Sequence, residues 1–283
     1  MLKNIMWTVV GVVLFSVIAA LFLGKYRERR NVQKLENRLL QNRKPSSIHK
    51  VDFAAFAQLP EPVARYFRYA LIDGQPIINL MRMQQIGLLR TNTITDKWVT
   101  FVASQLVVPS APGFIWNAKM AMPLKTHVGV LDSYIAGIGS GRVSFLSAVV
   151  IAADTGAQEL NSGALLRYLA EAVWYPTALL PESGIVWTPI DEGAALATLI
   201  DGETSVSLEF RFNTIGEVTS IFCHDRFRSM NGKYVKMPWE GRFKNYTIKS
   251  GMKVPTYGEV GWYELDVLQL VWKGNITKIQ FEL

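Results

Sequence analysis

The sequence has few of the residues that common metal sites and catalytic sites require. It contains one cysteine, Cys223, and three histidines, His49, His127 and His224. One cysteine excludes a disulfide framework, and these four residues are too isolated to form a four-ligand zinc site. HExxH and GxSxG motifs are lacking, and the glycine-rich segment 137–141 has no lysine of a phosphate-binding loop. We therefore predict neither a metal nor a cofactor.

Cys223, His224 and Asp225 are adjacent, which at first suggests a nucleophile, a base and an orienting carboxylate. Successive side chains of a strand point to opposite faces, so His224 is expected to point away from the other two. We interpret the three residues as part of an ordinary strand with one buried thiol.

The positive charge is confined to one end of the chain. Residues 1–44 contain nine Lys and Arg and two Glu, and 9 − 2 = +7 is the formal charge of the whole protein. The other 239 residues hold 21 basic and 21 acidic side chains (30 − 9 and 23 − 2). A neutral domain is not attracted to phosphate backbones, so we predict no nucleic-acid partner.

Residues 5–23 form an apolar run without a charge. As a helix they would span about 28 Å, close to the thickness of a bilayer core. A cleaved signal peptide is the alternative, but a basic cluster follows at residues 25–30 where cleavage sites have small residues. We predict a single-pass anchor over residues 1–24, whose partner is the lipid bilayer through residues 5–23.

Basic residues on the two sides of this run suggest an orientation. One lysine precedes the run, whereas eight Lys and Arg follow within about twenty residues, which favours a cytoplasmic domain. The opposite orientation, with a translocated domain, remains the alternative, because the same basic cluster could lie against anionic lipid head groups. Residues 25–50 are predicted to form a basic stalk or linker, with a charged, solvated helix over 26–42.

Residues 51–283 are predicted to form one mainly β domain. Apolar and polar side chains alternate over residues 206–212, as in a strand with one buried face. Segments bounded by Gly, Pro, Asn or Asp predict strands at 78–91, 97–108, 113–121, 124–135, 142–151, 184–190, 194–200, 204–213, 217–228, 241–250, 254–265 and 270–282.

Two helices are expected beside these strands. One follows Pro62, and the other covers residues 161–174 and is stopped by Pro176. Short turns between strands predict antiparallel pairing, and a sheet of about ten or more strands usually curls. The predicted fold is therefore a curled antiparallel sheet or half-barrel, with the second helix inserted over its concave face.

Several motifs together resemble those of a bacterial family of unknown function, over roughly residues 59–265. They are LPEPVARY at 59–66, PGFIW at 112–116, DxYxxGxG at 132–139, RYLAExxWxPxALLP at 167–181 and GEVxW at 258–262. The resemblance implies no activity. The predicted architecture is also similar to the LolA-like half-barrels that carry lipid or lipoprotein acyl chains, a likeness of shape that does not establish function.

The best candidate site lies on the inserted helix. Arg167, Glu171 and Trp174 recur at i, i+4 and i+7, so they share one helix face. They could be an exposed ion pair beside a core tryptophan, or they could point into the curled sheet and orient the head group of an amphipathic ligand. In the second case the aromatic residues expected beside them are Trp116, Tyr134, Trp187 and Trp262.

Three functions fit these features. The first is a membrane-anchored module that binds a lipid-like or other apolar small molecule in the half-barrel. The second is an enzyme acting on a hydrophobic substrate, with Glu171 or Asp132 as acid/base and Arg167 as anion stabiliser. The third is a structural or interaction protein of the cell envelope.

Overall fold

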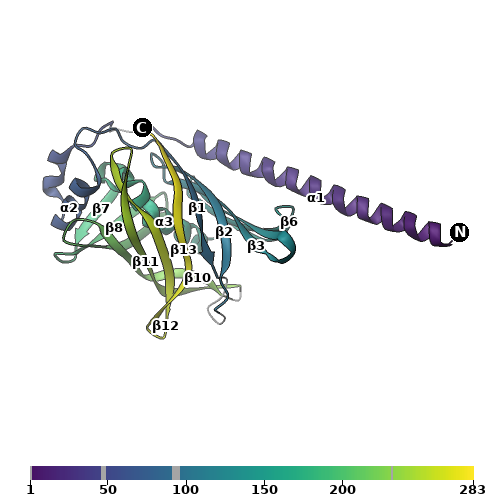
Figure 1. Cartoon of the computed structure of the whole chain (residues 1–283). Coiled ribbons are helices and arrows are strands. Elements are labelled where there is room, and N and C mark those ends of the chain that lie inside the picture. Colours follow the sequence, from purple (N-terminus) through teal and green to yellow (C-terminus); the bar gives the residue numbers. More distant parts are fainter. Residues whose placement is uncertain (1, 46–48, 91–95, 231) are drawn as a thin grey trace.

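The computed structural model describes residues 2–45, 49–90, 96–230 and 232–283. A long N-terminal helix leads into a curled sheet of thirteen strands, which forms the half-barrel predicted from the sequence (Figure 1). The strands are β1 (Leu80–Leu89), β2 (Val99–Val108), β3 (Gly113–Met122), β4 (Thr126–Ile135), β5 (Ile138–Phe145), β6 (Val149–Thr155), β7 (Ile185–Pro189), β8 (Ala194–Asp201), β9 (Thr204–Phe212), β10 (Val218–Met230), β11 (Lys233–Lys249), β12 (Met252–Glu264) and β13 (Val267–Glu282).

The first and last strands of the chain, β1 and β13, are neighbours in the sheet. The order is β6-β5-β4-β3-β2-β1-β13-β12-β11-β10-β9-β8-β7, with each neighbouring pair antiparallel. The chain runs outward from β1 to the edge strand β6, crosses to the other edge at β7, and returns to β13 beside β1. The strands on either side of this crossing are therefore joined to their sheet neighbours in chain order.

The crossing segment is the inserted helix. Helix α3 (Gln158–Glu171) and three short 3-10 turns (Ala172–Trp174, Pro176–Leu179 and Pro181–Ser183) carry the chain from β6 to β7. Because α3 packs against β4 and β5 on one side and β9 and β10 on the other, it bridges both halves of the concave face. Helix α2 (Glu61–Ala70), with the 3-10 turn Phe53–Gln58 before it, packs near β8, β9 and β12.

Helix α1 (Leu2–Gln41) has two parts with different surroundings. It is the one helix of the described residues that is long and apolar enough to cross a membrane, and its apolar window is fully exposed. The basic part of α1, residues 25–41, packs on the outer face of the sheet. There Leu39 is fully buried among Leu106, Ile115 and Leu131. This packing makes the second part of α1 a component of the folded body rather than a helix surrounded by solvent.

Further contacts join α1 to one end of the half-barrel. Glu28 forms an ion pair with Arg142 of β5 at 3.4 Å. Gly24 lies against the turn between β5 and β6, so closely that a Cβ there would collide with the carbonyl oxygen of Ala148. The last apolar residues of α1 therefore end beside this hairpin (Figure 1).

The structure corrects one predicted strand. Residues 142–151 form parts of β5 and β6, which are joined by a turn with Leu146 and Ser147 at positive φ. Turns of this backbone shape usually contain Gly, Asn or Asp, so an apolar residue such as Leu146 gave no signal of a turn. The division of the chain at residues 24 and 50 stays a prediction.

Candidate functional site

A cavity of about 690 Å³ lies between α3 and the concave face of the sheet. Most of its surface is apolar, and its charged lining residues are Lys97, Asp132, Arg167, Glu171, Arg226 and Glu259. The lining residues are Leu89, Lys97, Val99, Trp116, Met120, Ala121, Met122, Pro123, Val128, Val130, Asp132, Val143, Arg167, Ala170, Glu171, Trp174, Ile221, Arg226, Trp239, Phe243, Gly258, Glu259, Val260, Trp262, Val271 and Trp272. This volume and composition are typical of pockets that hold small molecules.

One charged cluster is centred on Arg167 of α3. Its Nε donates to Glu171 Oε1 at 2.7 Å, and a terminal nitrogen donates to Asp132 Oδ2 on β4 at 2.9 Å. The helical spacing of four residues brings Arg167 and Glu171 together, as predicted from the sequence. The guanidinium carbon also lies 4.8 Å from the ring centre of Trp116, so a cation–π contact stabilises the positive charge of Arg167.

Burial and ion pairing shift the pKa values of this cluster in opposite directions. Burial raises the pKa of Asp132 above its ordinary value, and the neighbouring Arg167 only partly offsets that rise. Burial alone would lower the pKa of Arg167, but Glu171 and Asp132 together raise it. Arg167 is therefore held as a cation by two carboxylates, one of which is costly to ionise.

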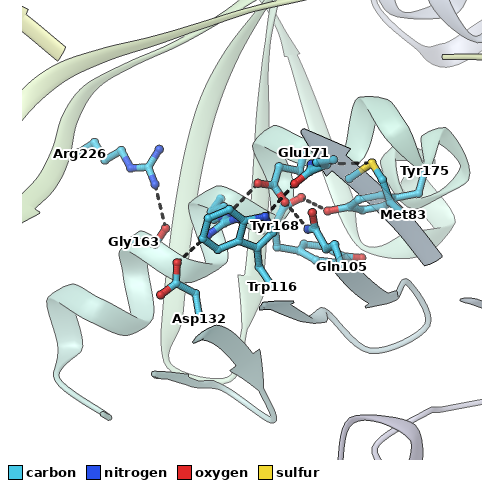
Figure 2. A network of polar contacts seen from close by, with 11 residues as sticks. Met83, Gln105, Trp116, Asp132, Gly163, Tyr168, Glu171, Tyr175 and Arg226 are labelled. Carbon is cyan, nitrogen blue, oxygen red and sulfur yellow. Dashed lines mark hydrogen bonds and ion pairs between the residues drawn. The ribbon is translucent and has the colours of Figure 1, made fainter. Parts of the chain in front are cut away.

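Amide and indole groups extend the network behind this cluster (Figure 2). The side chain of Gln105 donates to Glu171, and the indole N–H of Trp116 donates to Gln85 at 2.7 Å. The indole nitrogen of Trp174 is buried and makes no hydrogen bond in the described part of the chain. The polar groups that hold the Arg167 cluster thus come from α3, β1, β2, β3 and β4.

A second charged group in the lining is Arg226 on β10. Its guanidinium carbon lies 4.2 Å from the ring centre of Trp239 and 5.6 Å from that of Trp262. It donates one long hydrogen bond, 3.5 Å, to the carbonyl oxygen of Gly163 (Figure 2). Burial lowers the pKa of Arg226 to about 10, which leaves the side chain protonated at neutral pH.

The structure brings most of the sequence-predicted site residues to one place. Those that line the cavity, together with the proposed acid/base Asp132, are Trp116, Arg167, Glu171, Trp174 and Trp262. Tyr134 and Trp187 lie elsewhere: the Tyr134 hydroxyl donates to Asp201 at 2.8 Å, and the Trp187 indole donates to the Leu179 carbonyl at 3.0 Å. Trp174 belongs to the 3-10 turn that continues α3, and still reaches the cavity. A ligand-binding role for these residues stays a prediction.

Sequence reasoning missed Arg226, because it treated residues 217–228 as a regular strand. A bulge lies between Cys223 and Arg226, where two residues of β10 face one residue of β11. The side chains of His224 and Asp225 are both exposed, and His224 Nδ1 lies 2.9 Å from Asp225 Oδ1. The expectation that Asp225 shares a strand face with Cys223 was therefore wrong. The signal for the bulge was Pro238, which lies opposite it and has no N–H for the ladder.

Cys223 itself packs against the core, and burial raises the pKa of its thiol. This disfavours the thiolate that a nucleophile requires. Among the described residues, no group of three or more His, Cys, Asp or Glu is placed to hold a metal ion.

One rim of the cavity lies beside the end of the apolar part of α1. Met122 and Pro123, at the turn between β3 and β4, line the cavity. His127 follows that turn and bonds Ser147 of the β5–β6 turn at 2.9 Å, which joins the two hairpins. Burial lowers the pKa of His127, and the nearby charges of Lys119 and Lys25 of α1 lower it further. Leu124, at the tip of the first turn, is 94% exposed.

A family model matches residues 49–274, which is most of the chain. The chain belongs to DUF6544, a family of unknown function. No curated protein matches this chain.

Solved structures with a related shape are distant in sequence. A LolA superfamily protein from Nitrosomonas europaea is 9% identical, with 82% of this chain and 94% of that chain covered and a TM-score of 0.44. A putative outer membrane lipoprotein-sorting protein domain from Vibrio parahaemolyticus is 10% identical, with coverage of 81% and 91% and a TM-score of 0.43. A DUF1329 family protein from Desulfovibrio piger is 8% identical, with coverage of 82% and 95% and a TM-score of 0.43.

Proposed function

We propose that this protein is a membrane-anchored binding module that holds a lipid-like ligand in its half-barrel. The observation that carries the proposal is the cavity of about 690 Å³, with mainly apolar walls and a few charged groups at fixed positions. Such a site holds an apolar chain by excluding water and orients the polar end through the charged groups. A domain whose concave face was filled with side chains could not do this.

The position of α1 supports the same proposal. Residues 5–23 anchor the protein in the bilayer, and Gly24 lies against the β5–β6 hairpin. The neighbouring β3–β4 hairpin, which carries the exposed Leu124, lines the cavity through Met122 and Pro123. A lipid that leaves the bilayer near the anchor therefore has a short path to the cavity. The basic residues of α1 favour the cytoplasmic side for the domain.

The test is mass spectrometry of organic extracts from the full-length protein purified in detergent. We expect a lipid or other apolar molecule in stoichiometric amount with the wild type. Val260→Trp, which fills the cavity, should lose it. Val102→Trp is the matched control, because Val102 lies on a strand of the same sheet but is 55% exposed outside the cavity.

A ligand-free wild type would contradict the proposal, and so would equal ligand in both tryptophan variants. Thermal unfolding of each variant checks that the loss follows from the filled cavity and not from failure to fold.

A catalytic role is the second candidate, because the raised pKa of Asp132 is typical of carboxyl groups that donate a proton. Asp132 would act as acid/base on a hydrophobic substrate, with Arg167 stabilising negative charge. In that case the extract of Asp132→Asn should accumulate a molecule that the wild type converts. The same molecule from both proteins would favour binding alone.

A further inference from the structure

The bulge in β10 determines which charge faces the cavity. Ile221 lines the cavity and Cys223 packs against the core, so alternate residues of β10 point inward up to this position. The extra residue moves both His224 and Asp225 to the outside, and Arg226 then points inward. In a regular strand Asp225 would have followed Cys223 on the inner face. The bulge thus places a cation where alternation would place a carboxylate.

Arg226 differs from the other arginines near the cavity in having no carboxylate partner. Within the described residues, no Asp or Glu oxygen lies within 4 Å of its guanidinium, and its one hydrogen bond is the long contact to Gly163. Arg167 has two carboxylate partners, and Arg228, two residues further along β10, pairs with Glu264 at 2.7 Å. Arg226 alone among these three keeps most of its five donors available.

The surroundings of Arg226 hold it in place without neutralising it. Trp239 and Trp262 lie against the guanidinium, and a planar group stacked on aromatic rings keeps its edge open for hydrogen bonds. Arg226 is half-buried, and burial without a carboxylate partner disfavours the cation and lowers the pKa of its guanidinium. An acidic ligand would supply the missing negative charge.

We propose that Arg226 binds the acidic head group, a carboxylate or phosphate, of a long-chain molecule whose apolar part occupies the cavity. The proposal rests on the proposed function and specifies the chemical class of the ligand. Guanidinium groups bind such oxyanions through two parallel hydrogen bonds, and a water-poor cavity strengthens each of them. Arg167 also lines the cavity, but it already donates to its own carboxylates, Glu171 and Asp132.

The test compares ligands that share a chain but differ in charge. The full-length protein is reconstituted in phosphatidylcholine nanodiscs at about pH 8.5, and retention of labelled oleate, methyl oleate and oleyl phosphate is measured against empty nanodiscs. We expect oleate or oleyl phosphate to bind at least tenfold more tightly than methyl oleate. The phosphate-to-carboxylate preference identifies which head group the site accepts.

Variants assign the preference to one residue. Arg226→Gln should weaken the binding of oleate or oleyl phosphate to the level of methyl oleate and so remove the tenfold preference, and Arg226→Lys should recover part of it. Arg211→Gln is the matched control, because Arg211 also stacks on an aromatic ring, that of Phe222, but does not line the cavity. Circular dichroism melts confirm that each variant is folded.

The outcomes separate this inference from the proposed function. If the wild type binds neither oleate nor oleyl phosphate more tightly than methyl oleate, or if Arg226→Gln keeps the preference, the head-group assignment is wrong and the apolar site stands. If the wild type retains none of the three probes, the proposed function itself fails. Displacement of oleate by about 10 mM inorganic phosphate would assign Arg226 to a small free anion and overturn the head-group assignment.

Discussion

Two arginines that line one cavity have contrasting partners. Both stack on tryptophan: Arg167 on Trp116, and Arg226 on Trp239 and Trp262. Arg167 is neutralised by Asp132 and Glu171, whereas Arg226 has no carboxylate within ion-pair distance in the described chain. Both guanidinium groups therefore have aromatic neighbours, but the described residues supply carboxylate partners to Arg167 and none to Arg226.

The difference indicates which arginine stabilises the fold and which is available to a ligand. A guanidinium with two carboxylate partners links α3 to β4 and fixes the helix over the sheet. An unpaired guanidinium costs folding free energy, and such costs are retained mainly where function requires them. We therefore predict that Arg167 chiefly stabilises the fold and that Arg226 contributes chiefly to binding.

The largest effect that tests this contrast is on stability. Arg167→Met leaves Asp132 and Glu171 close together without their cation, and should lower the free energy of unfolding by about 3 kcal/mol. Asp132 keeps a third of its side chain exposed, which holds this value at the lower end of the range for buried pairs. Arg226→Met removes an unpaired charge and should change stability by less than about 1 kcal/mol. Urea unfolding of both variants measures the difference.

A triple variant checks the cause of this loss. Adding Asp132→Asn and Glu171→Gln to Arg167→Met removes the repelling carboxylates and should recover most of the lost stability. Equal losses in Arg167→Met and Arg226→Met would show that the two arginines contribute alike, and the contrast would be wrong.

Much of the fold could be predicted because its signals are local. Alternation marked the strand at 206–212, turn residues bounded the other strands, and Pro176 marked the end of the inserted helix, because these signals act within a few residues of the chain. The turn at Leu146 was missed, since nothing in that segment has the chemistry of a turn. Packing of Leu39 on the sheet was missed as well, because it joins residues distant in sequence.

The same distinction applies to the candidate site. Arg167, Glu171 and Trp174 were found from helical spacing, which is fixed within a few residues. Arg226 was missed because its direction depends on a bulge, and the bulge depends on Pro238 of the neighbouring strand. A proline in one strand predicts an irregular partner only after the pairing register is known.

The second-largest expected effect is a change of stability with pH that depends on the ionisation of Asp132. Burial raises its pKa in the folded protein above the ordinary value of 3.8, so the folded state binds a proton more readily than the unfolded state. The resulting stability is complete below about pH 4 and is lost as the pH rises through the raised folded value. Asp132→Asn cannot ionise, so its stability relative to the wild type should rise from about pH 4 upward. Urea unfolding at several pH values measures this trend, and parallel curves would show that Asp132 is not responsible.

The smallest effect would make Arg228 resemble its unpaired neighbour. Arg228 lies over Trp262 and is held by Glu264 at 2.7 Å. Glu264→Gln removes the negative charge of that pair and leaves a second uncompensated cation beside Trp262, which lines the cavity. We expect oleate to bind about threefold more tightly, or roughly 0.6 kcal/mol, with no change for methyl oleate. Nanodisc retention measures the change, and Glu209→Gln, which frees Arg211 outside the cavity, is the control. If both variants raised oleate binding equally, the gain would come from net charge, and the position of Arg228 beside Trp262 would have no special role.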